Sequence, residues 1–295
     1  MIDYSDWNEY DGLSEGSGRS EKIWLTNPHT FELGLFKFKK DVDTTDHISE
    51  RISYKLAQLL GIECARFEIG TYEGREGSMS YNIVQYRPDC VLVEGYNYIL
   101  KKYINYDSST LKIRGTDIVY SLEMIRKSID GYIEFKDFLK IPMFDYLIGN
   151  TDRHQNNWAI LEENGTYTLS PLYDNSSSLC AYNTSEKELD ACLGKDQVKW
   201  NSVLVTKSRS IIRIYENDTK KPTHLQVLQY LKENYYNDTV DFVRKCIDNV
   251  TETNICDIMG EFSEDILSPK KKQVIIKFIL SKVKMMKDIY FGEEE

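Results

Sequence analysis

Three polar side chains suited to work on a phosphate lie on either side of one short segment of this chain. The stretch before it reads G-N-T-D-R-H-Q-N-N-W, residues 149–158, and the stretch after it reads S-P-L-Y-D-N-S, residues 170–176. They contain Asp152, Asn157 and Asp174. A carboxylate can orient a hydroxyl group and accept its proton, while carboxylate and amide oxygens can hold Mg²⁺ on phosphates. The set therefore predicts a site for phosphoryl transfer.

The segment between the two stretches has the pattern of a β-hairpin. Residues 158–161 and 167–173 are rich in strand-forming side chains, and Asn164-Gly165 lies between them. Asn-Gly is typical of a two-residue hairpin turn, because both of its positions need positive φ. A hairpin brings its two ends together, so we expect Asp152, Asn157 and Asp174 to lie at one end of it.

The spacing adds to this prediction. Asn157 follows Asp152 by five positions, the interval that separates the catalytic aspartate of protein kinases from their metal-binding asparagine. Taken alone, an aspartate in a turn is usually a cap or a backbone acceptor, and Arg153 beside it could form a surface ion pair. The prediction therefore rests on the three residues together and on their order.

The two stretches, G-N-T-D-R-H-x-x-N and S-P-L-Y-D-N-S-S-S, resemble those of the HipA-like kinases. This group includes toxin kinases of bacterial persistence modules and shorter single-gene relatives. The resemblance implies a protein-kinase-like fold, ATP and Mg²⁺ as cofactors, and transfer of the γ-phosphate to serine or threonine of a protein. It also implies Asp152 as the catalytic base and Asn157 and Asp174 as Mg²⁺ ligands.

Kinases also need a cation on the α- and β-phosphates, held by an acidic residue of the adjacent helix. Lys37 in L-G-L-F-K-F-K-K and Glu50 in E-R-I-S-Y-K-L-A-Q-L-L-G-I are the candidates, and the second stretch resembles a helix of the same family. Ser49 stands where that family has asparagine. Strand alternation puts Lys39 on the same face as Lys37, so the choice stays open, although we favour Lys37.

Further candidates surround the expected nucleotide. Residues 18–22 resemble the family's short G-x-x-x-K segment, and a glycine-rich loop can bring backbone N–H groups close to phosphates. A plain flexible loop is the alternative. In HipA-like kinases a serine near this loop can be autophosphorylated, which makes Ser14, Ser17 and Ser20 candidates. We expect the adenine near a hinge and His154 to brace the catalytic loop; the cofactor-binding candidates besides Lys37 and Glu50 are Gly16, Ser17, Gly18, Lys22, Gln85, Tyr86 and His154.

The elements that must position these residues fall into two parts. Strand patterns cover residues 21–25, 31–39, 63–72 and 79–86, and a helical pattern begins at Asp46 and ends at Gly61. Beyond residue 96 the pattern is mainly helical, with long helical stretches at 118–148 and 268–290. We therefore predict an α+β, two-lobed, protein-kinase-like fold. Residues 1–88 would form a small antiparallel β N-lobe with one helix, and residues 89–295 a larger, mainly α-helical C-lobe.

Composition limits the classes of function. The chain has 295 residues, with 37 Lys and Arg against 47 Asp and Glu and a net charge of −10, which argues against nucleic-acid or membrane-surface binding as its main task. Six cysteines without a C-x-x-C pair indicate reduced thiols rather than zinc or disulfides. With no signal peptide and no apolar run of membrane-spanning length, we expect a cytoplasmic protein.

Two other functions remain open. A small-molecule phosphotransferase of the aminoglycoside-kinase type would need an acceptor pocket lined by carboxylates, for which residues 185–190 are the acidic candidate, although such a cluster is usually solvated. A non-catalytic nucleotide-binding toxin–antitoxin module is the second. Expected partners are a protein substrate with a serine or threonine acceptor, and an antitoxin or small accessory protein. The chain leaves no room for the extra N-terminal domain of larger HipA toxins, so it resembles their compact relatives.

Overall fold

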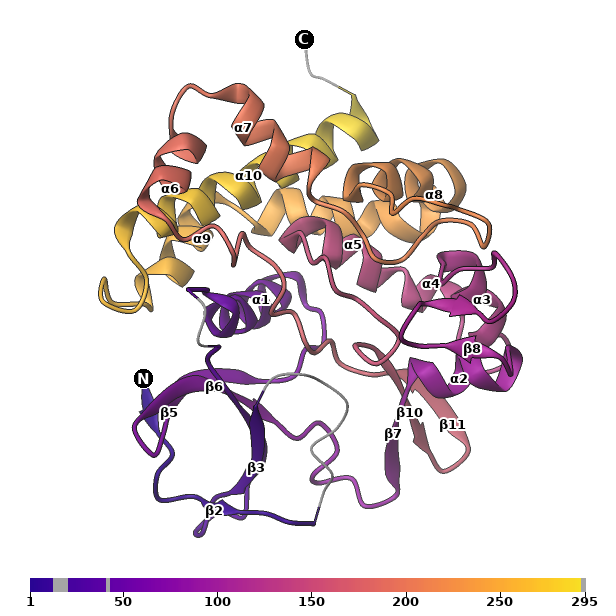
Figure 1. Ribbon diagram of the computed structural model, residues 1–295, viewed down its shortest axis with the longest axis horizontal. Helices are drawn as coiled ribbons and strands as arrows, with labels where there is room; N and C mark the ends of the chain where they lie inside the picture. The colour runs from indigo at the N-terminus through magenta and orange to yellow at the C-terminus, as the bar shows by residue number, and fades with distance from the viewer. Residues whose placement is uncertain (13–20, 41–42, 293–295) are drawn as a thin grey trace.

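The computed structural model describes residues 1–12, 21–40 and 43–292. Its N-terminal part is a curled six-stranded sheet (Figure 1) with the order β1-β5-β6-β4-β3-β2. All neighbouring strands are antiparallel except β1 and β5, which are parallel. The strands are β1 (Ile2–Asp3), β2 (Asn8–Glu9), β3 (Lys22–Thr26), β4 (Leu33–Phe38), β5 (Phe67–Tyr72) and β6 (Arg75–Tyr81).

The curled sheet encloses a small core of its own. Leu25, Phe36 and Met79 are fully buried there, together with Tyr4 and Tyr72. Leu25, Phe36 and Met79 come from three neighbouring strands, β3, β4 and β6, so the three strands bury side chains in one shared core. Tyr4 reaches this core because β1 adds to the edge of the sheet, a contact that the sequence did not predict.

A glycine permits close approach where β6 passes the strand that carries Lys37. Gly77 pairs with Phe38, and a Cβ atom at position 77 would come within 2.3 Å of the Lys37 carbonyl oxygen. No side chain fits in that space, so only glycine lets the two strands pair in this register.

The helix α1 (Asp46–Leu60) lies between the curled sheet and the helical part of the molecule (Figure 1). Ile48, Ile52 and Leu56 recur at helical spacing and are buried. The helix ends at Gly61, whose φ of 64° is left-handed and whose N–H bonds back to the last turn. The helix and its end therefore lie where the sequence predicted them.

A second sheet begins after the turn at residues 83–86. It contains β7 (Cys90–Glu94), β10 (Ala159–Glu163) and β11 (Thr166–Leu169), in the order β11-β10-β7. Strands β10 and β11 form the predicted hairpin, with Asn164 and Gly165 both at positive φ. The third strand, β7, was not predicted and pairs antiparallel with β10.

The remainder of the chain is mainly helical. Two short strands, β8 (Tyr106–Asp107) and β9 (Lys112–Ile113), form a separate pair. The helices are α2 (Gly95–Lys102), α3 (Leu122–Ile129), α4 (Phe135–Phe138), α5 (Lys140–Ile148), α6 (Glu186–Leu193), α7 (Gln197–Asn201), η1 (Ser202–Thr206), α8 (His224–Asn249), α9 (Glu252–Gly260) and α10 (Pro269–Phe291).

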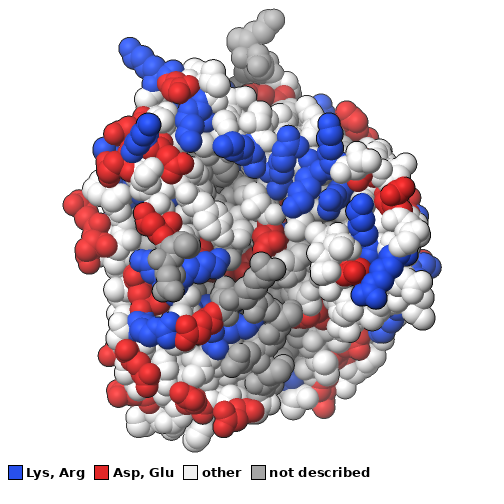
Figure 2. All heavy atoms as spheres, in the orientation of Figure 1, with Lys and Arg blue, Asp and Glu red and all other residues white. Residues whose placement is uncertain are grey.

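Acidic and basic side chains both occur on the face seen in Figure 2.

Within residues 1–12, 21–40 and 43–292, no helix has the length and apolar character needed to cross a membrane.

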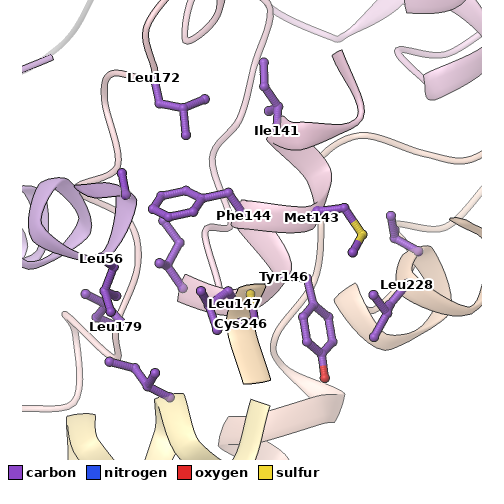
Figure 3. Close-up of a cluster of buried hydrophobic side chains, with 14 of the residues drawn as sticks. Leu56, Ile141, Met143, Phe144, Tyr146, Leu147, Leu172, Leu179, Leu228 and Cys246 are labelled. Carbon is purple, nitrogen blue, oxygen red and sulfur yellow. The ribbon is translucent and has the colours of Figure 1, made fainter. Parts of the chain in front are cut away.

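The main core is organised around α5. Figure 3 shows Phe144 pointing from this helix toward Leu56 of α1, and Met143 pointing toward Leu228 of α8. All four side chains are buried. Since α5 leads directly into the polar stretch at residues 150–157, its packing against α1 and α8 fixes where that stretch begins.

Three predicted elements differ from the structure. The strand expected at residues 79–86 is β6, which covers Arg75–Tyr81 and is followed by a turn. The helical stretch expected at 118–148 is divided into α3, α4 and α5, because Gly131, at a φ of 84°, follows the end of α3. The strand expected from residue 63 begins only at Phe67, since Cys64 forms an isolated bridge to Leu172 instead. The third difference ties the loop after α1 to the segment that carries Asp174.

Candidate active site

A cavity of about 950 Å³ brings together side chains from both parts of the molecule. The curled sheet contributes Lys37 from β4, and α1 contributes Glu50. The helical part contributes Asp152 and His154 from the loop after α5, and Asp174 from the segment after β11. The structure therefore gathers residues that are far apart in the sequence around one space.

Lys37 lies between two carboxylates in this cavity. Its Nζ is 3.7 Å from Glu50 Oε1 and 3.4 Å from Asp174 Oδ1. The other oxygen of Glu50 accepts a hydrogen bond of 2.8 Å from the backbone N–H of Asn175. Glu50 thus ties α1 both to the lysine of β4 and to the segment that carries Asp174.

The electrostatics of this cluster follow from its burial. Burial raises the pKa of Glu50 to about 7, although the charge of Lys37 opposes this. Burial alone would lower the pKa of Lys37, but Asp174 and Glu50 outweigh it and raise that pKa. Burial likewise disfavours the charge of Asp174, yet Lys37 and Arg153 lower its pKa on balance. Lys37 and Asp174 therefore stay charged at neutral pH.

Lys39, the competitor of Lys37, has a different partner. Its Nζ lies 2.9 Å from Glu76 Oε2 on the neighbouring strand β6. Both lysines face the cavity, as strand alternation required. Only Lys37 contacts Glu50 and Asp174, so the structure places Lys37 at the centre of the cluster and Lys39 at its edge.

The loop at residues 150–157 is shaped by hydrogen bonds to its own backbone. Asn157 Nδ2 donates to the Asp152 carbonyl oxygen at 2.8 Å, and the His154 N–H donates to the same oxygen at 2.8 Å. The N–H of Asp152 donates to Asn150 Oδ1 at 3.1 Å. Among the described residues, none donates to the carboxylate of Asp152 itself, which lines the cavity. Burial raises its pKa.

Arg153 holds this loop against the segment that carries Asp174. Only 1% of its side chain is exposed, and its Nη2 lies 2.8 Å from Asp145 Oδ1 of α5. Its Nη1 donates to the carbonyl oxygens of Asn157 and Tyr173, at 2.7 and 2.6 Å, and its Nη2 donates to Asn175 Oδ1. The alternative that Arg153 forms a surface ion pair is therefore wrong, because its ion pair with Asp145 is buried.

Mg²⁺ prefers oxygen ligands, and the residues around the cavity offer several. The carboxylates of Glu50, Asp145 and Asp174 face two cations in this region, Lys37 and Arg153. Asn157 uses its Nδ2 in the loop, which leaves its Oδ1 as the remaining acceptor. In the described ranges, no three His, Cys, Asp or Glu side chains are grouped to hold a metal alone. This set fits Mg²⁺ whose remaining ligands are phosphate oxygens and waters.

Of the other residues predicted to bind the cofactor, some line the cavity and some lie outside the described residues. Lys22 and His154 line the cavity, and His154 Nδ1 accepts a hydrogen bond of 3.2 Å from the N–H of Asn156. Gly16, Ser17 and Gly18 lie outside the described residues, as do the three serines proposed for autophosphorylation.

The predicted hinge residues Gln85 and Tyr86 do not line the cavity. Strand β6 ends at Tyr81, and the following turn directs Gln85 toward the start of β4. There its Oε1 accepts a hydrogen bond of 2.6 Å from the Leu33 N–H, and its Nε2 donates to the Phe31 carbonyl oxygen. The ring of Tyr86 is 73% exposed. Gln85 and Tyr86 therefore lie outside this cavity, and their contact with a nucleotide stays a prediction.

A second buried hydrogen-bond network contacts the loop at residues 150–157, at its first residue. The sequence did not predict this network. His224 Nε2 lies 2.8 Å from the Asn150 carbonyl oxygen, and His224 Nδ1 lies 2.9 Å from Ser208 Oγ. Lys282 Nζ donates to Ser208 Oγ at 3.2 Å. A carbonyl only accepts, so Nε2 carries the proton, and neutral His224 accepts from Ser208 at Nδ1. Burial, reinforced by Lys282, lowers the pKa of His224 to about 3.

The fold and the cavity together define a two-lobed, protein-kinase-like protein. Residues 14–221, more than half of the chain, match the family described as the HipA-like C-terminal domain. The chain therefore belongs to this family. No match was found among curated proteins.

Two solved structures have the same fold. A proinflammatory kinase of Helicobacter pylori, CtkA, matches with a TM-score of 0.80 and 19% identity, and the match covers 99% of each chain. HipA of Shewanella oneidensis, solved with HipB and its operator DNA, matches with a TM-score of 0.59 and 14% identity. That match covers 97% of this chain and 69% of HipA. The predicted α+β, two-lobed fold is confirmed.

Proposed function

We propose that this protein is an ATP- and Mg²⁺-dependent kinase that transfers the γ-phosphate to a serine or threonine hydroxyl of a protein. The observation that carries the proposal is the cluster of Lys37, Glu50 and Asp174, which shares one cavity with Asp152. These residues provide what phosphoryl transfer needs, namely a cation for the phosphates, metal ligands and a base for the acceptor.

Each residue has a distinct task in this mechanism. Bound Mg²⁺–ATP supplies the phosphoryl group and neutralises charge on its phosphates. Lys37, held by Glu50, positions the phosphates, while Asn157 and Asp174 would hold the metal. Asp152 orients the acceptor hydroxyl and accepts its proton as the oxygen attacks. Arg153 acts on none of the reacting atoms, but it fixes the positions of the Asp152 and Asp174 segments relative to one another.

The carboxylates at residues 185–190 do not favour a small-molecule acceptor. Glu186 and Asp190 lie on the exposed face of α6 and pair with Lys270 Nζ, at 2.5 and 2.8 Å. Neither residue lines the cavity. The acidic cluster at residues 185–190 therefore gives no support to a small-molecule acceptor, and the protein acceptor is proposed from the family resemblance.

The partner is proposed from the comparisons. Because the Shewanella HipA was solved with HipB and operator DNA, we include an antitoxin of the HipB kind among the partners of this chain. Autophosphorylation of Ser14, Ser17 or Ser20 stays a prediction from the family resemblance.

The two lysines of β4 provide a matched test. Phosphate incorporation from γ-labelled ATP into a generic protein acceptor is measured with Mg²⁺ and with chelator, followed by phosphoamino-acid analysis. The wild type is expected to label serine or threonine only with Mg²⁺. Lys37→Met should reduce labelling by about a hundredfold, since the phosphates lose their positioning cation, whereas Lys39→Met should remain within about twofold of wild type. Equal effects of both substitutions would remove the assigned role of Lys37.

A further inference from the structure

The segment at residues 207–221, which joins η1 to α8, carries a group of exposed cations. We call it the basic ridge, and its members are Lys207, Arg209, Lys220 and Lys221. Among the described residues, no carboxylate forms an ion pair with any of the four, although some cations elsewhere, such as Arg66 with Glu32, are paired. Four exposed positive charges on one short segment stand out in a chain of net charge −10.

The two acidic residues of the segment do not neutralise the ridge. Glu216 accepts a hydrogen bond of 2.7 Å from Lys127 Nζ and another from the hydroxyl of Tyr103. Asp218 Oδ2 accepts from the backbone N–H groups of Ile214 and Tyr215, at 3.2 and 3.0 Å. Glu216 is therefore engaged with residues outside the segment, Asp218 is engaged with the backbone of the segment itself, and neither forms an ion pair with a ridge cation.

Hydrogen bonds hold the two ends of the segment together, so that the residues around Arg209 lie beside those around Lys221. Arg209 Nη1 donates to the Lys221 carbonyl oxygen at 2.7 Å, and the N–H of Ser210 donates to the Pro222 carbonyl oxygen at 3.0 Å. Arg209 and Thr223 form an antiparallel bridge. The cations of both ends are thus presented side by side on a fixed backbone, which lowers the entropic cost of binding a partner.

The ridge borders the candidate active site. Ile211, which lies between Arg209 and Lys220 in the sequence, lines the same cavity as Asp152. Ser208 and His224 connect the segment to the carbonyl oxygen of Asn150, two residues before Asp152. Figure 2 shows Lys and Arg side chains gathered above the centre of this face, over the segment that leads to α8 in Figure 1.

We propose that the basic ridge is a docking surface for an acidic stretch of the polypeptide that carries the acceptor hydroxyl. The ridge would bind glutamate or aspartate side chains beside the acceptor serine or threonine and so place the hydroxyl at Asp152. This inference rests on the proposed kinase function, because it assigns the ridge to the substrate of that reaction. Exposed charge pairs add little individually, so the ridge acts through several contacts and through faster association.

An acidic peptide fits the ridge better than a nucleic acid does. Nucleic-acid binding needs cations along an extended track of phosphates, whereas the four ridge cations are confined to one short segment at the mouth of a cavity. The net charge of the whole chain is −10, and it repels a long polyanion that extends beyond the ridge.

Peptide binding without nucleotide tests the proposal separately from catalysis. The probes are a fluorescent peptide with one serine followed by a run of glutamates, the same peptide with glutamines, and a fluorescent single-stranded DNA oligonucleotide. Fluorescence anisotropy is measured for the wild type and for the triple variant Lys207→Gln, Lys220→Gln, Lys221→Gln. The charge-matched control is Lys187→Gln, Lys195→Gln, Lys245→Gln, at exposed lysines away from the cavity.

The glutamate peptide should bind the wild type more tightly than the glutamine peptide does. The ridge variant should weaken that binding by about tenfold, and the control by less than about twofold. Equal weakening by both variants, no preference for the glutamate peptide, or ridge-dependent binding of the oligonucleotide instead would each overturn the proposal. The two proposals can fail separately. If the glutamate peptide binds the ridge but the protein transfers no phosphate, the docking surface is supported and the proposed kinase function is wrong.

Discussion

At the scale of single residues, the candidate site keeps a carboxylate in surroundings that disfavour its charge. Glu50 is 1% exposed, and its Oε1 lacks a hydrogen-bond partner in the described part of the chain. Its pKa of about 7 lies well above the ordinary glutamate value. Buried groups with perturbed pKa values are typical of functional sites, so we infer that Glu50 serves its contacts to Lys37 and Asn175 rather than the stability of the fold.

This leads to a prediction for Glu50→Gln. Between the ordinary glutamate pKa and about 7, the folded state binds more protons than the unfolded state, so Glu50 lowers stability as pH rises through that window. At pH 8 the variant should therefore be at least as stable as wild type, by up to about 1 kcal/mol. Its phosphoryl transfer should fall at least about tenfold, because Lys37 loses its anchor.

Thermal unfolding at pH 8 and a labelling assay check both parts of this prediction. Glu76→Gln, which removes the partner of Lys39 instead, is the control and should keep its activity within about twofold. A Glu50→Gln protein that unfolds more easily at pH 8 while retaining full transfer would contradict the account.

At this scale the sequence predicted that Asp152 and Asp174 would lie close together, which the structure shows, but it did not predict the residues that hold their segments in place. Asp152, Asn157 and Asp174 could be found because their spacing around an Asn-Gly hairpin is local in the chain. Arg153 could not, because its role depends on Asp145, Tyr173 and Asn175 meeting it in three dimensions. The contacts of Gln85 with Leu33 and Phe31 were not predicted, because β6 ends at Tyr81 and Gln85 lies in the turn after it rather than in a strand.

At the scale of elements, three segments meet behind the loop that carries Asp152. Helix α8 contributes His224, α10 contributes Lys282, and the segment between η1 and α8 contributes Ser208. Lys282 is 1% exposed, and no carboxylate pairs with it among the described residues. Burial lowers its pKa to about 7.

We predict that Lys282 makes stability depend on pH. Between about pH 7 and the ordinary lysine pKa the unfolded state binds more protons than the folded state, so stability rises with pH in that window. Below pH 7 the lysine is charged in both states, and the penalty of burying its charge is fully present. Lys282→Met should therefore raise the unfolding midpoint at pH 6.5 by about 2 °C or more, and its advantage should shrink by pH 9.

Thermal unfolding at the two pH values measures this effect. Lys284→Met replaces an exposed lysine of the same helix and should leave the pH dependence unchanged. If Lys282→Met and wild type show the same change in midpoint between pH 6.5 and pH 9, Lys282 is not the group responsible.

The elements themselves were predictable where their patterns are local. The hairpin, α1 with its Gly61 end, and α10 all lie close to their predicted residues. Strands β1, β2 and β7 were missed because they are short and exist through partners distant in sequence, such as β10 for β7. Their stability comes from pairing and not from their own residues.

At the scale of the whole molecule, α1 and the loop after α5 join the two lobes around one cavity. Figure 1 shows the curled sheet on one side of α1 and the helices on the other. Glu50 and Arg153 both bond to Asn175, at its N–H and its Oδ1, so one residue couples the two lobes. The two-lobed division was predictable from the change of pattern along the chain, but this coupling was not.

The central claim is that Asp152 serves as the base for phosphoryl transfer between these lobes. The most direct measurement compares wild type with Asp152→Asn for binding of Mg²⁺–ATP by calorimetry and for transfer of labelled phosphate to a protein acceptor. Nucleotide affinity should stay within about threefold, since Asp152 makes no contact that holds Lys37 or Asp174. Transfer should fall by about a hundredfold or more. Transfer by Asp152→Asn at the wild-type rate would contradict the account.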